Sequence, residues 1–184
     1  MKSNRVRIIG GAWRSRLVPF PTRPDLRPTP DRVRETLFNW LGQDLGGRSC
    51  LDLFAGSGAL GFEAASRGAR RVVMVERDPV VFRQLAATRD ALGAAAVELR
   101  RADALEFLRA DDGAYDVVFV DPPYRSDLWL RIAPLLPRHL APQALVYLER
   151  AGRAGPLPGW AVWRHGRAGQ VAYQLLTRAE GALP

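Results

Sequence analysis

From residue 49 onward, short apolar runs alternate along the chain with segments whose apolar side chains recur every three or four residues. The runs show no polar alternation, which is typical of strands buried on both faces, whereas the segments between them have helical spacing. The predicted strands are 49–54, 71–76, 97–100, 115–120 and 144–149, and the predicted helices are 59–67, 79–92, 104–109 and 128–136. Strands separated by helices predict right-handed βαβ units, and therefore an α/β fold with a mostly parallel sheet covered on both faces.

Both ends of the chain depart from this alternation. Segments 160–165 and 170–177 are joined by a short glycine-bounded turn, which predicts a hairpin at one edge of the sheet. Near the start, the β-like pieces 5–9 and 13–18 flank Gly10-Gly11 and predict a second hairpin, followed by the proline-rich connector PFPTRPDLRP. We therefore expect a basic N-terminal extension over 1–28 and the α/β domain over 29–184.

A helix is predicted directly after the connector. Thr29 is suited to the N-cap, Pro30 to the first helical position, and Asp31 to the positive end of the helix dipole. The apolar residues that recur at helical spacing are Val33, Leu37, Trp40 and Leu41. They form one stripe, and Arg32 and Arg34 lie off it.

The charge of the chain indicates a polyanionic partner. The 184 residues carry a formal net charge of +8, and of the 27 basic residues only Lys2 is a lysine. A codon bias would explain arginine in place of lysine, but not the excess of positive charge, so RNA or DNA is the leading candidate. In extended strands, Arg5 and Arg7 share one face, as do Arg14 and Arg16. Contact with nucleic acid is favoured over a merely solvated hairpin face.

Other classes of protein have little support. No apolar run approaches the roughly 18 residues of a membrane span, and the N-terminus lacks the apolar region of a signal peptide. The single cysteine, Cys50, lies in the apolar run CLDLF and is expected to be a buried thiol. His139 and His165 are isolated, and no pair of residues has the spacing of metal ligands. We expect a cytoplasmic protein without a metal, and nothing demands more than a monomer.

A glycine-rich loop follows the first strand of the α/β region. Gly56, Gly58 and Gly61 satisfy G-x-G-x-x-G between a strand and a helix, a pattern that fits both dinucleotides and S-adenosylmethionine. Glu76 ends the next strand, 20 residues after Gly56, where an acid can accept hydrogen bonds from ribose hydroxyls. Asp103, at the following strand-to-helix junction, is suited equally to an adenine amino group and to a helix N-cap.

Asp52 distinguishes the two cofactor classes. It lies in the first strand, just before the glycines. A carboxylate there would repel a pyrophosphate, whereas it would attract the sulfonium or α-ammonium group of S-adenosylmethionine. The loop therefore favours S-adenosylmethionine.

The apolar run VVFV ends in Asp121-Pro122-Pro123-Tyr124. In a doubly wound sheet, the carboxyl ends of strands near the reversal of strand order bind ligands. The prolines remove two backbone N–H groups and fix φ, so the loop offers hydrogen-bond acceptors on a stiff frame. Such acceptors can hold the hydrogens of an exocyclic amine while the ring of Tyr124 stacks on the base. A stiff turn without chemistry is the alternative.

At this point the sequence resembles a known family. The segments that carry the resemblance are RIIGGAWRSR, LRPTPDRVRETLFNWL, CLDLFAGSGALGFEAASRGA, FVDPPY and AGQVAYQLL. They are similar to the bacterial 16S rRNA guanine-N2 methyltransferases, which are adenosylmethionine-dependent amino methyltransferases. The resemblance covers almost the whole chain, whereas RADDGAYD and the tail after Arg150 match only loosely.

The resemblance implies a fold and a set of site residues. The expected fold is a seven-stranded sheet whose last strand is antiparallel, with an N-terminal hairpin that contacts RNA or the small ribosomal subunit. Asp121 and the Pro122 carbonyl would bind the guanine amino group, and Tyr124, where many relatives have Phe, would stack on the base. The expected cofactor-binding residues are Asp52, Phe54, Ala55, Gly56, Ser57, Gly58, Glu76, Arg77, Asp103 and Ala104. The arginines expected to contact RNA are Arg5, Arg7, Arg14, Arg16, Arg27, Arg32 and Arg34.

Three other functions fit parts of the sequence. A DNA adenine or protein glutamine methyltransferase could use the same tetrapeptide, usually with Asn first, but those enzymes generally need a further recognition domain. A nicotinamide-dependent oxidoreductase fits the glycine loop but explains neither Asp52 nor the paired prolines. A non-catalytic RNA-binding assembly factor with this fold would be expected to have lost polar groups of the site, and all of them are present.

Overall fold

The computed structural model describes residues 4–24, 26–123, 127–151 and 157–179, and its centre is a seven-stranded sheet in the order β5-β4-β3-β6-β7-β9-β8. The strands are β3 (Ser49–Asp52), β4 (Arg71–Val75), β5 (Val97–Arg100), β6 (Tyr115–Val120), β7 (Leu140–Ala151), β8 (Trp160–Ala168) and β9 (Val171–Arg178). The first five are parallel, whereas β9 is antiparallel to both neighbours. The predicted α/β sheet with an antiparallel last strand is confirmed.

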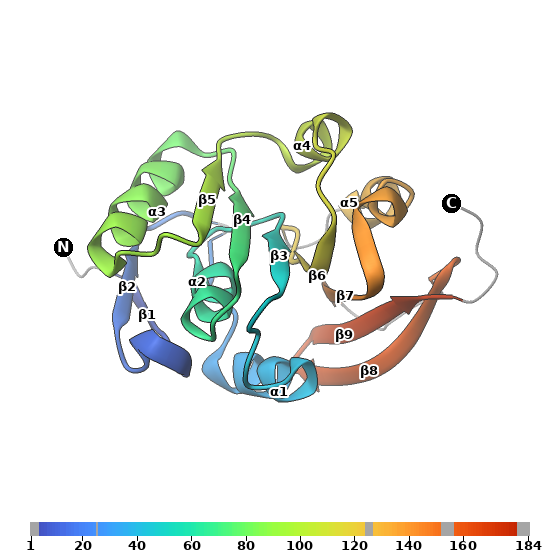
Figure 1. Ribbon diagram of the computed structural model, residues 1–184, viewed down its shortest axis with the longest axis horizontal. Helices are drawn as coiled ribbons and strands as arrows, with labels where there is room; N and C mark the ends of the chain where they lie inside the picture. Colours follow the sequence, from blue (N-terminus) through green and yellow to red (C-terminus); the bar gives the residue numbers. More distant parts are fainter. Residues whose placement is uncertain (1–3, 25, 124–126, 152–156, 180–184) are drawn as a thin grey trace.

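Helices cover both faces of the sheet. The helices are α1 (Asp31–Leu41), α2 (Ala59–Ser66), α3 (Pro79–Leu92), α4 (Ala104–Ala110) and α5 (Leu128–Ile132), together with the 3-10 turns η1 (Gly11–Trp13) and η2 (Leu136–His139). Apolar residues of α1, α2 and α3 join one hydrophobic cluster, and those of α4, α5 and η2 join the other. Figure 1 shows α4 and α5 together on one side of the sheet and α1 on the opposite side. Each face therefore has its own core.

Two predicted elements near the end of the chain have different bounds. The helix predicted over 128–136 is instead divided into α5 and η2. Pro134 and Pro137 explain the division, because a proline has no N–H for a helical hydrogen bond. The predicted C-terminal hairpin is confirmed as β8, which is longer than expected, and β9, which is shifted by one residue; β9 lies between β7 and the edge strand β8.

The N-terminal hairpin is real but shorter than its sequence suggests. It consists of β1 (Asn4–Arg7) and β2 (Leu17–Phe20), with Arg7 paired to Leu17. Arg14 and Arg16 lie in the connection before β2, so the prediction that they share a strand face is wrong. The connection is tight because it packs on the end of α2: a Cβ on Gly11, whose φ is +74°, would lie 1.8 Å from the carbonyl oxygen of Ser66. Only glycine fits both the backbone angle and the contact.

A buried carboxylate in α2 fixes the hairpin. Glu63 is fully buried and accepts hydrogen bonds from the backbone N–H groups of Ile9 and Gly10, both at 2.8 Å. It also pairs with the guanidinium groups of Arg34 at 3.1 Å and Arg67 at 2.9 Å. Glu63 therefore joins the hairpin, α1 and α2 through one satisfied cluster of charges.

Two predictions about α1 and the residues before it are wrong. Arg34 lies on the buried side of the helix with 1% of its surface exposed, so its predicted contact with RNA is wrong. Its Nε donates to the carbonyl of Thr29 at 3.1 Å. The side chain of Thr29 does not cap the helix, because the helix begins at Asp31 and has no side-chain cap. The buried residues of α1 are Val33, Arg34, Leu37, Phe38 and Leu41, whereas Trp40 is half-buried.

The lone cysteine is confirmed as a buried thiol. Cys50 lies in β3 with no exposed surface, and burial, with a smaller effect from the charge of Asp116, raises its pKa to about 12. Such a thiol stays protonated and unreactive at neutral pH. In the described part of the chain, no helix is long and apolar enough to cross a membrane.

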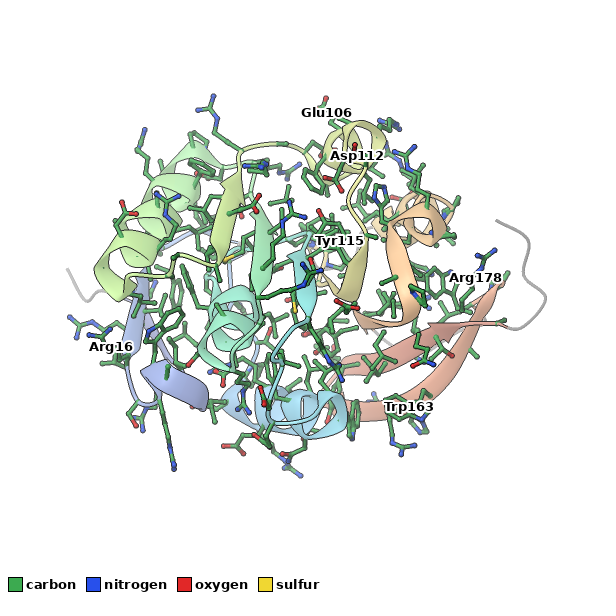
Figure 2. All side chains as sticks on the ribbon, in the orientation of Figure 1. Arg16, Glu106, Asp112, Tyr115, Trp163 and Arg178 are labelled. Atoms are coloured by element: carbon green, nitrogen blue, oxygen red, sulfur yellow. The ribbon has the colours of Figure 1, made fainter. Side chains whose placement is uncertain are left out.

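Replacing Glu63 tests the role of this cluster. Glu63→Ala should lower the free energy of unfolding by about 3–5 kcal/mol, because it removes the carboxylate that pairs with Arg67 and leaves Arg34 with Asp31 alone. Urea denaturation measures the difference, and hydrogen exchange should show faster exchange at the amides of Ile9 and Gly10. The control is Glu106→Ala on α4, whose exposed side chain points away from the molecule (Figure 2). Equal stability of the two variants would contradict the proposed anchoring.

Candidate functional site

The candidate site lies where the strand order reverses. The chain passes from β3 to β4 on one side, while β6 pairs with the other side of β3. Asp52, the last residue of β3, is paired with Phe119, so the glycine loop after β3 and Asp121 after β6 leave the same edge of the sheet next to each other. The adjacency predicted for these two motifs is therefore observed, and it is the arrangement that binds ligands in doubly wound sheets.

The glycine loop turns sharply into α2. Gly56 and Gly58 have φ values of +49° and +80°, which side chains rarely adopt. A Cβ on Gly56 would lie 2.8 Å from the Cδ1 atom of Leu26 in the proline-rich connector. The connector thus lies against the glycine loop. Of the other predicted loop residues, Ala55 and Ser57 are buried and Phe54 is half-buried.

Asp52 is a buried carboxylate that lacks a full set of donors. Its Oδ2 accepts the N–H of Gly61, in the first turn of α2, at 3.1 Å. Within the described residues no donor reaches Oδ1, although only 1% of Asp52 is exposed. Burial raises the pKa of Asp52 to about 7, aided by the charge of Glu76, whereas the N–H groups of Phe54 and Gly61 lower it. This carboxylate is suited to a cationic ligand group.

Glu76 braces the loop from the end of β4. Its Oε2 accepts the N–H of Gly56 at 3.0 Å, and its Oε1 accepts the N–H of Asp78 at 2.7 Å. The carboxylate is half-buried, and its neighbour Arg77 is exposed. Glu76 therefore holds the glycine loop and lies at the sheet edge where a ribose was expected.

Asp103 acts as a helix cap. Its Oδ1 accepts the N–H groups of Leu105 at 2.9 Å and Glu106 at 3.3 Å, so it satisfies the start of α4. Of the two roles considered, the N-cap is observed, and contact with an adenine amino group stays a prediction. Ala104, the other residue expected there, is buried.

The connector also contacts the end of β4 through an ion pair. Arg23 Nε lies 2.9 Å from Asp78 Oδ2, and this guanidinium, with the N–H of Val81, lowers the pKa of Asp78 to about 2. The same aspartate caps α3 by accepting the N–H of Val80 at 2.7 Å. The connector is thereby tied to the cofactor side of the site.

Asp121 is a half-buried carboxylate at the end of β6. The hydroxyl of Thr29 donates to its Oδ2 at 3.5 Å. Burial raises the pKa of Asp121 well above its ordinary value, and the charges of Glu149 and Asp52 raise it further. Pro122 is half-buried and Pro123 exposed, whereas Tyr124 lies outside the described residues. Among the described residues, the hydroxyl of Thr29 is the one donor to the Asp121 side chain.

Two residues near Asp121 were not predicted from the sequence. Thr29 was assigned to a helix cap, but its hydroxyl contacts Asp121. Glu149, two residues before the end of β7, lies on the strand next to Asp121. A signal for Glu149 existed, because it is an acid directly after an apolar run, as Asp121 is.

These residues fit S-adenosylmethionine. The unsatisfied oxygen of Asp52 matches a cationic group, Glu76 offers acceptor oxygens for ribose hydroxyls, and the tight glycine turn lets a ligand approach the backbone. A pyrophosphate would be repelled by Asp52. Among the described residues, no three His, Cys, Asp or Glu side chains are grouped to hold a metal ion.

Comparison with known families agrees with this geometry. The family described as "Conserved hypothetical protein 95" matches residues 6–177, nearly the whole chain. This chain belongs to that family. Ribosomal RNA small subunit methyltransferase D of Escherichia coli K12, a similar protein, is 45% identical over 96% of this chain and 91% of its own length. The Haemophilus influenzae protein of the same name is 41% identical over 92% of each chain.

Solved structures place this member of the family among class I methyltransferases. The Escherichia coli protein yhhF superposes with a TM-score of 0.84 at 44% identity, over 95% of this chain and 98% of that one. An RNA methyltransferase from Salinibacter ruber, solved with S-adenosyl-L-homocysteine, has a TM-score of 0.66 at 24% identity, over 86% of this chain and 97% of that one. The second likeness concerns the fold alone.

The raised pKa of Asp52 predicts a pH-dependent gain in stability for Asp52→Asn. Below about pH 4 the aspartate is protonated in both folded and unfolded chains, so the variant should match the wild type. Between about pH 4 and 7 the unfolded chain loses this proton before the folded chain, so the wild-type free energy of unfolding falls as the pH rises. At about pH 8 the variant should be more stable by on the order of 4 kcal/mol.

Urea denaturation at several pH values measures this difference, and calorimetry with S-adenosylhomocysteine should show weaker binding by the same variant. Asp44→Asn is the matched control, because Asp44 is exposed and lies outside the site. A stability difference that does not change with pH would contradict the assigned titration.

Proposed function

We propose that this chain methylates the exocyclic N2 amine of a specific guanine in 16S rRNA, on a small-subunit particle, with S-adenosylmethionine as methyl donor. The observation that carries the proposal is the position of Asp121 beside the Asp52 and glycine-loop site at the reversal of strand order. The relatives named ribosomal RNA small subunit methyltransferase D support an rRNA substrate. Guanine N2 as the target rests on the resemblance of the sequence motifs.

Asp121 is the residue that holds the amine. The nitrogen of an exocyclic amine is a poor nucleophile, because its lone pair is delocalised into the ring. An acceptor that holds one N–H favours a more tetrahedral nitrogen whose lone pair points at an electrophile. When bound, S-adenosylmethionine supplies that electrophile as a methyl group on a positively charged sulfur. The raised pKa of Asp121 also suits its carboxylate to take the proton that N2 loses.

Thr29 and Asp52 have supporting roles in this proposal. The Thr29 hydroxyl, 3.5 Å from Oδ2 of Asp121, restrains the carboxylate that receives the amine. The carboxylate of Asp52 would hold the cationic part of the cofactor at the adjacent strand end. In this proposal, therefore, the carboxylate of Asp52 binds the cofactor and the carboxylate of Asp121 binds the base.

The RNA-binding surface would be the hairpin and the start of α1. Arg5, Arg7, Arg14, Arg16, Arg27 and Arg32 are exposed. Figure 2 shows Arg16 pointing outward at the hairpin end of the molecule. A polar groove of about 510 Å³ lies between the hairpin turn and α1, lined in part by Arg14 and Asn39. Phosphate groups are the ligands expected for such a surface.

Asp121→Ala tests the catalytic proposal. It should lower kcat by roughly 10²–10⁴-fold, because it removes both the acceptor of the amine and the proton acceptor. The assay incubates unmodified small ribosomal subunits with labelled S-adenosylmethionine and maps the labelled nucleotide. Calorimetry with S-adenosylhomocysteine should show unchanged affinity, since Asp52 and Glu76 remain. Glu106→Ala is the exposed acidic control, and full activity of Asp121→Ala would overturn the role of Asp121.

Removing the hairpin arginines tests the RNA-binding surface. Replacing Arg5, Arg7, Arg14 and Arg16 by Ala should weaken binding to small subunits and reduce its salt dependence. The slope of log K against log salt should fall by about 0.7–0.9 for each phosphate group that the variant no longer neutralises.

The control replaces the exposed arginines Arg109 of α4 and Arg131 of α5. This control should leave the salt slope unchanged. If both variants showed the wild-type slope, the hairpin would not bind phosphate.

A further inference from the structure

A second carboxylate lies beside Asp121 near the end of the neighbouring strand. In the register of β6 and β7, Val120 is paired with Leu148, so Asp121 and Glu149 occupy the next position on adjacent parallel strands. Such strands are about 4.8 Å apart. Side chains two residues apart share a face, and the rings of Phe119 and Tyr147 on that face are 6.4 Å apart. Asp121 and Glu149 therefore extend the same face into the site.

The orientation of Glu149 is restrained by its own strand. The hydroxyl of Tyr147, which is fully buried, donates to Glu149 Oε2 at 2.9 Å. This is the one hydrogen bond that the described residues make to the Glu149 side chain, and the side chain is half-buried. One oxygen is thus fixed by a buried tyrosine, and the other can accept a hydrogen bond from a ligand.

The two neighbouring carboxyl groups favour a base that presents N–H donors over a base that presents a lone pair. Burial raises the pKa of both carboxyl groups, and the charges of Glu149 and Asp52 raise that of Asp121 further, whereas the Tyr147 hydroxyl lowers that of Glu149. Among the described residues each side chain accepts a single hydrogen bond, so both are short of donors. A ligand that brings N–H donors relieves this deficit, whereas a ligand atom with a lone pair adds to it. Guanine presents two adjacent donor groups, N1–H and N2–H₂. Adenine presents an amine next to an N1 lone pair, and so does 2-aminopurine.

We propose that Glu149 recognises the N1–H of the target guanine next to the N2 amine held by Asp121, so that the site itself selects guanine. This inference rests on the proposed function and names the residue that would set its base specificity. Glu149 is separated from the cofactor-binding strand β3 by β6, so its role concerns the base rather than S-adenosylmethionine.

The test measures base preference rather than activity alone. The substrates are small-subunit particles reconstituted with 16S rRNA that carries either guanosine or 2-aminopurine riboside at the mapped nucleotide. 2-Aminopurine keeps the N2 amine but has a lone pair at N1 and no O6 oxygen, so the Glu149 variants are needed to assign the preference to N1. The wild type should have a kcat/KM at least about 10²-fold higher for guanosine, since a site built to bind an N–H rejects an analogue that lacks it.

Glu149→Gln should reduce this preference to about tenfold or less, because the glutamine amide can donate to the N1 lone pair. Its affinity for S-adenosylhomocysteine should equal that of the wild type, which shows that the variant folds. Tyr147→Phe should reduce the preference by a smaller factor, because it frees the carboxylate without removing it. Glu106→Gln, the same change at an exposed site, should leave the preference unaltered.

An unchanged preference in both Glu149→Gln and Tyr147→Phe would overturn the role of Glu149, even if turnover fell. If the wild type methylated guanosine with no preference over 2-aminopurine, the inference would fail while the proposed function stood. If the wild type methylated no guanosine at all, the proposed function would fail, and the inference with it.

Discussion

The carboxylate of Glu63 is fully buried and accepts hydrogen bonds from two backbone N–H groups and two arginines. A buried carboxylate with four donors is stable only while each donor stays in place. The donors come from the hairpin, α1 and the end of α2, and α2 begins at the glycine loop. One charged group therefore sets the position of the basic hairpin relative to the loop that would hold the cofactor.

The carboxylates near the site, in contrast, accept few hydrogen bonds from the described residues. Asp52 keeps an oxygen without a donor among the described residues, and Asp121 and Glu149 share a face with few donors between them. Burial raises the pKa of all three carboxyl groups. The molecule thus fully satisfies the carboxylate that fixes its architecture, whereas those near its proposed substrates accept few hydrogen bonds from the described residues, as expected around a binding site.

The sequence predicted the fold more completely than it predicted the side-chain contacts around the site. Alternation of apolar runs and helical spacing is a local property, and it predicts the sheet, the glycine loop and the positions of Asp52, Glu76 and Asp121. The errors concern side chains whose partners lie far away in the chain. Arg34 is buried because Glu63, 29 residues later, pairs with it, and hydrophobic periodicity assigns an arginine to the surface. Thr29 contacts Asp121, 92 residues away, and local rules predicted a helix cap.

The position of β9 has a consequence for the order in which the structure can be completed. β9 is made after β7 and β8 but lies between them, so β8 has no strand to pair with until residues 171–178 have been synthesised. Until then β7, which carries Glu149, is an open edge of the kind that pairs with other chains. Tyr173 of β9 pairs with Glu149 and packs on Trp40 of α1, with ring centroids 5.5 Å apart. A nascent chain can therefore form the glycine loop early, whereas the strand that pairs with Glu149, beside the proposed base site, is added last.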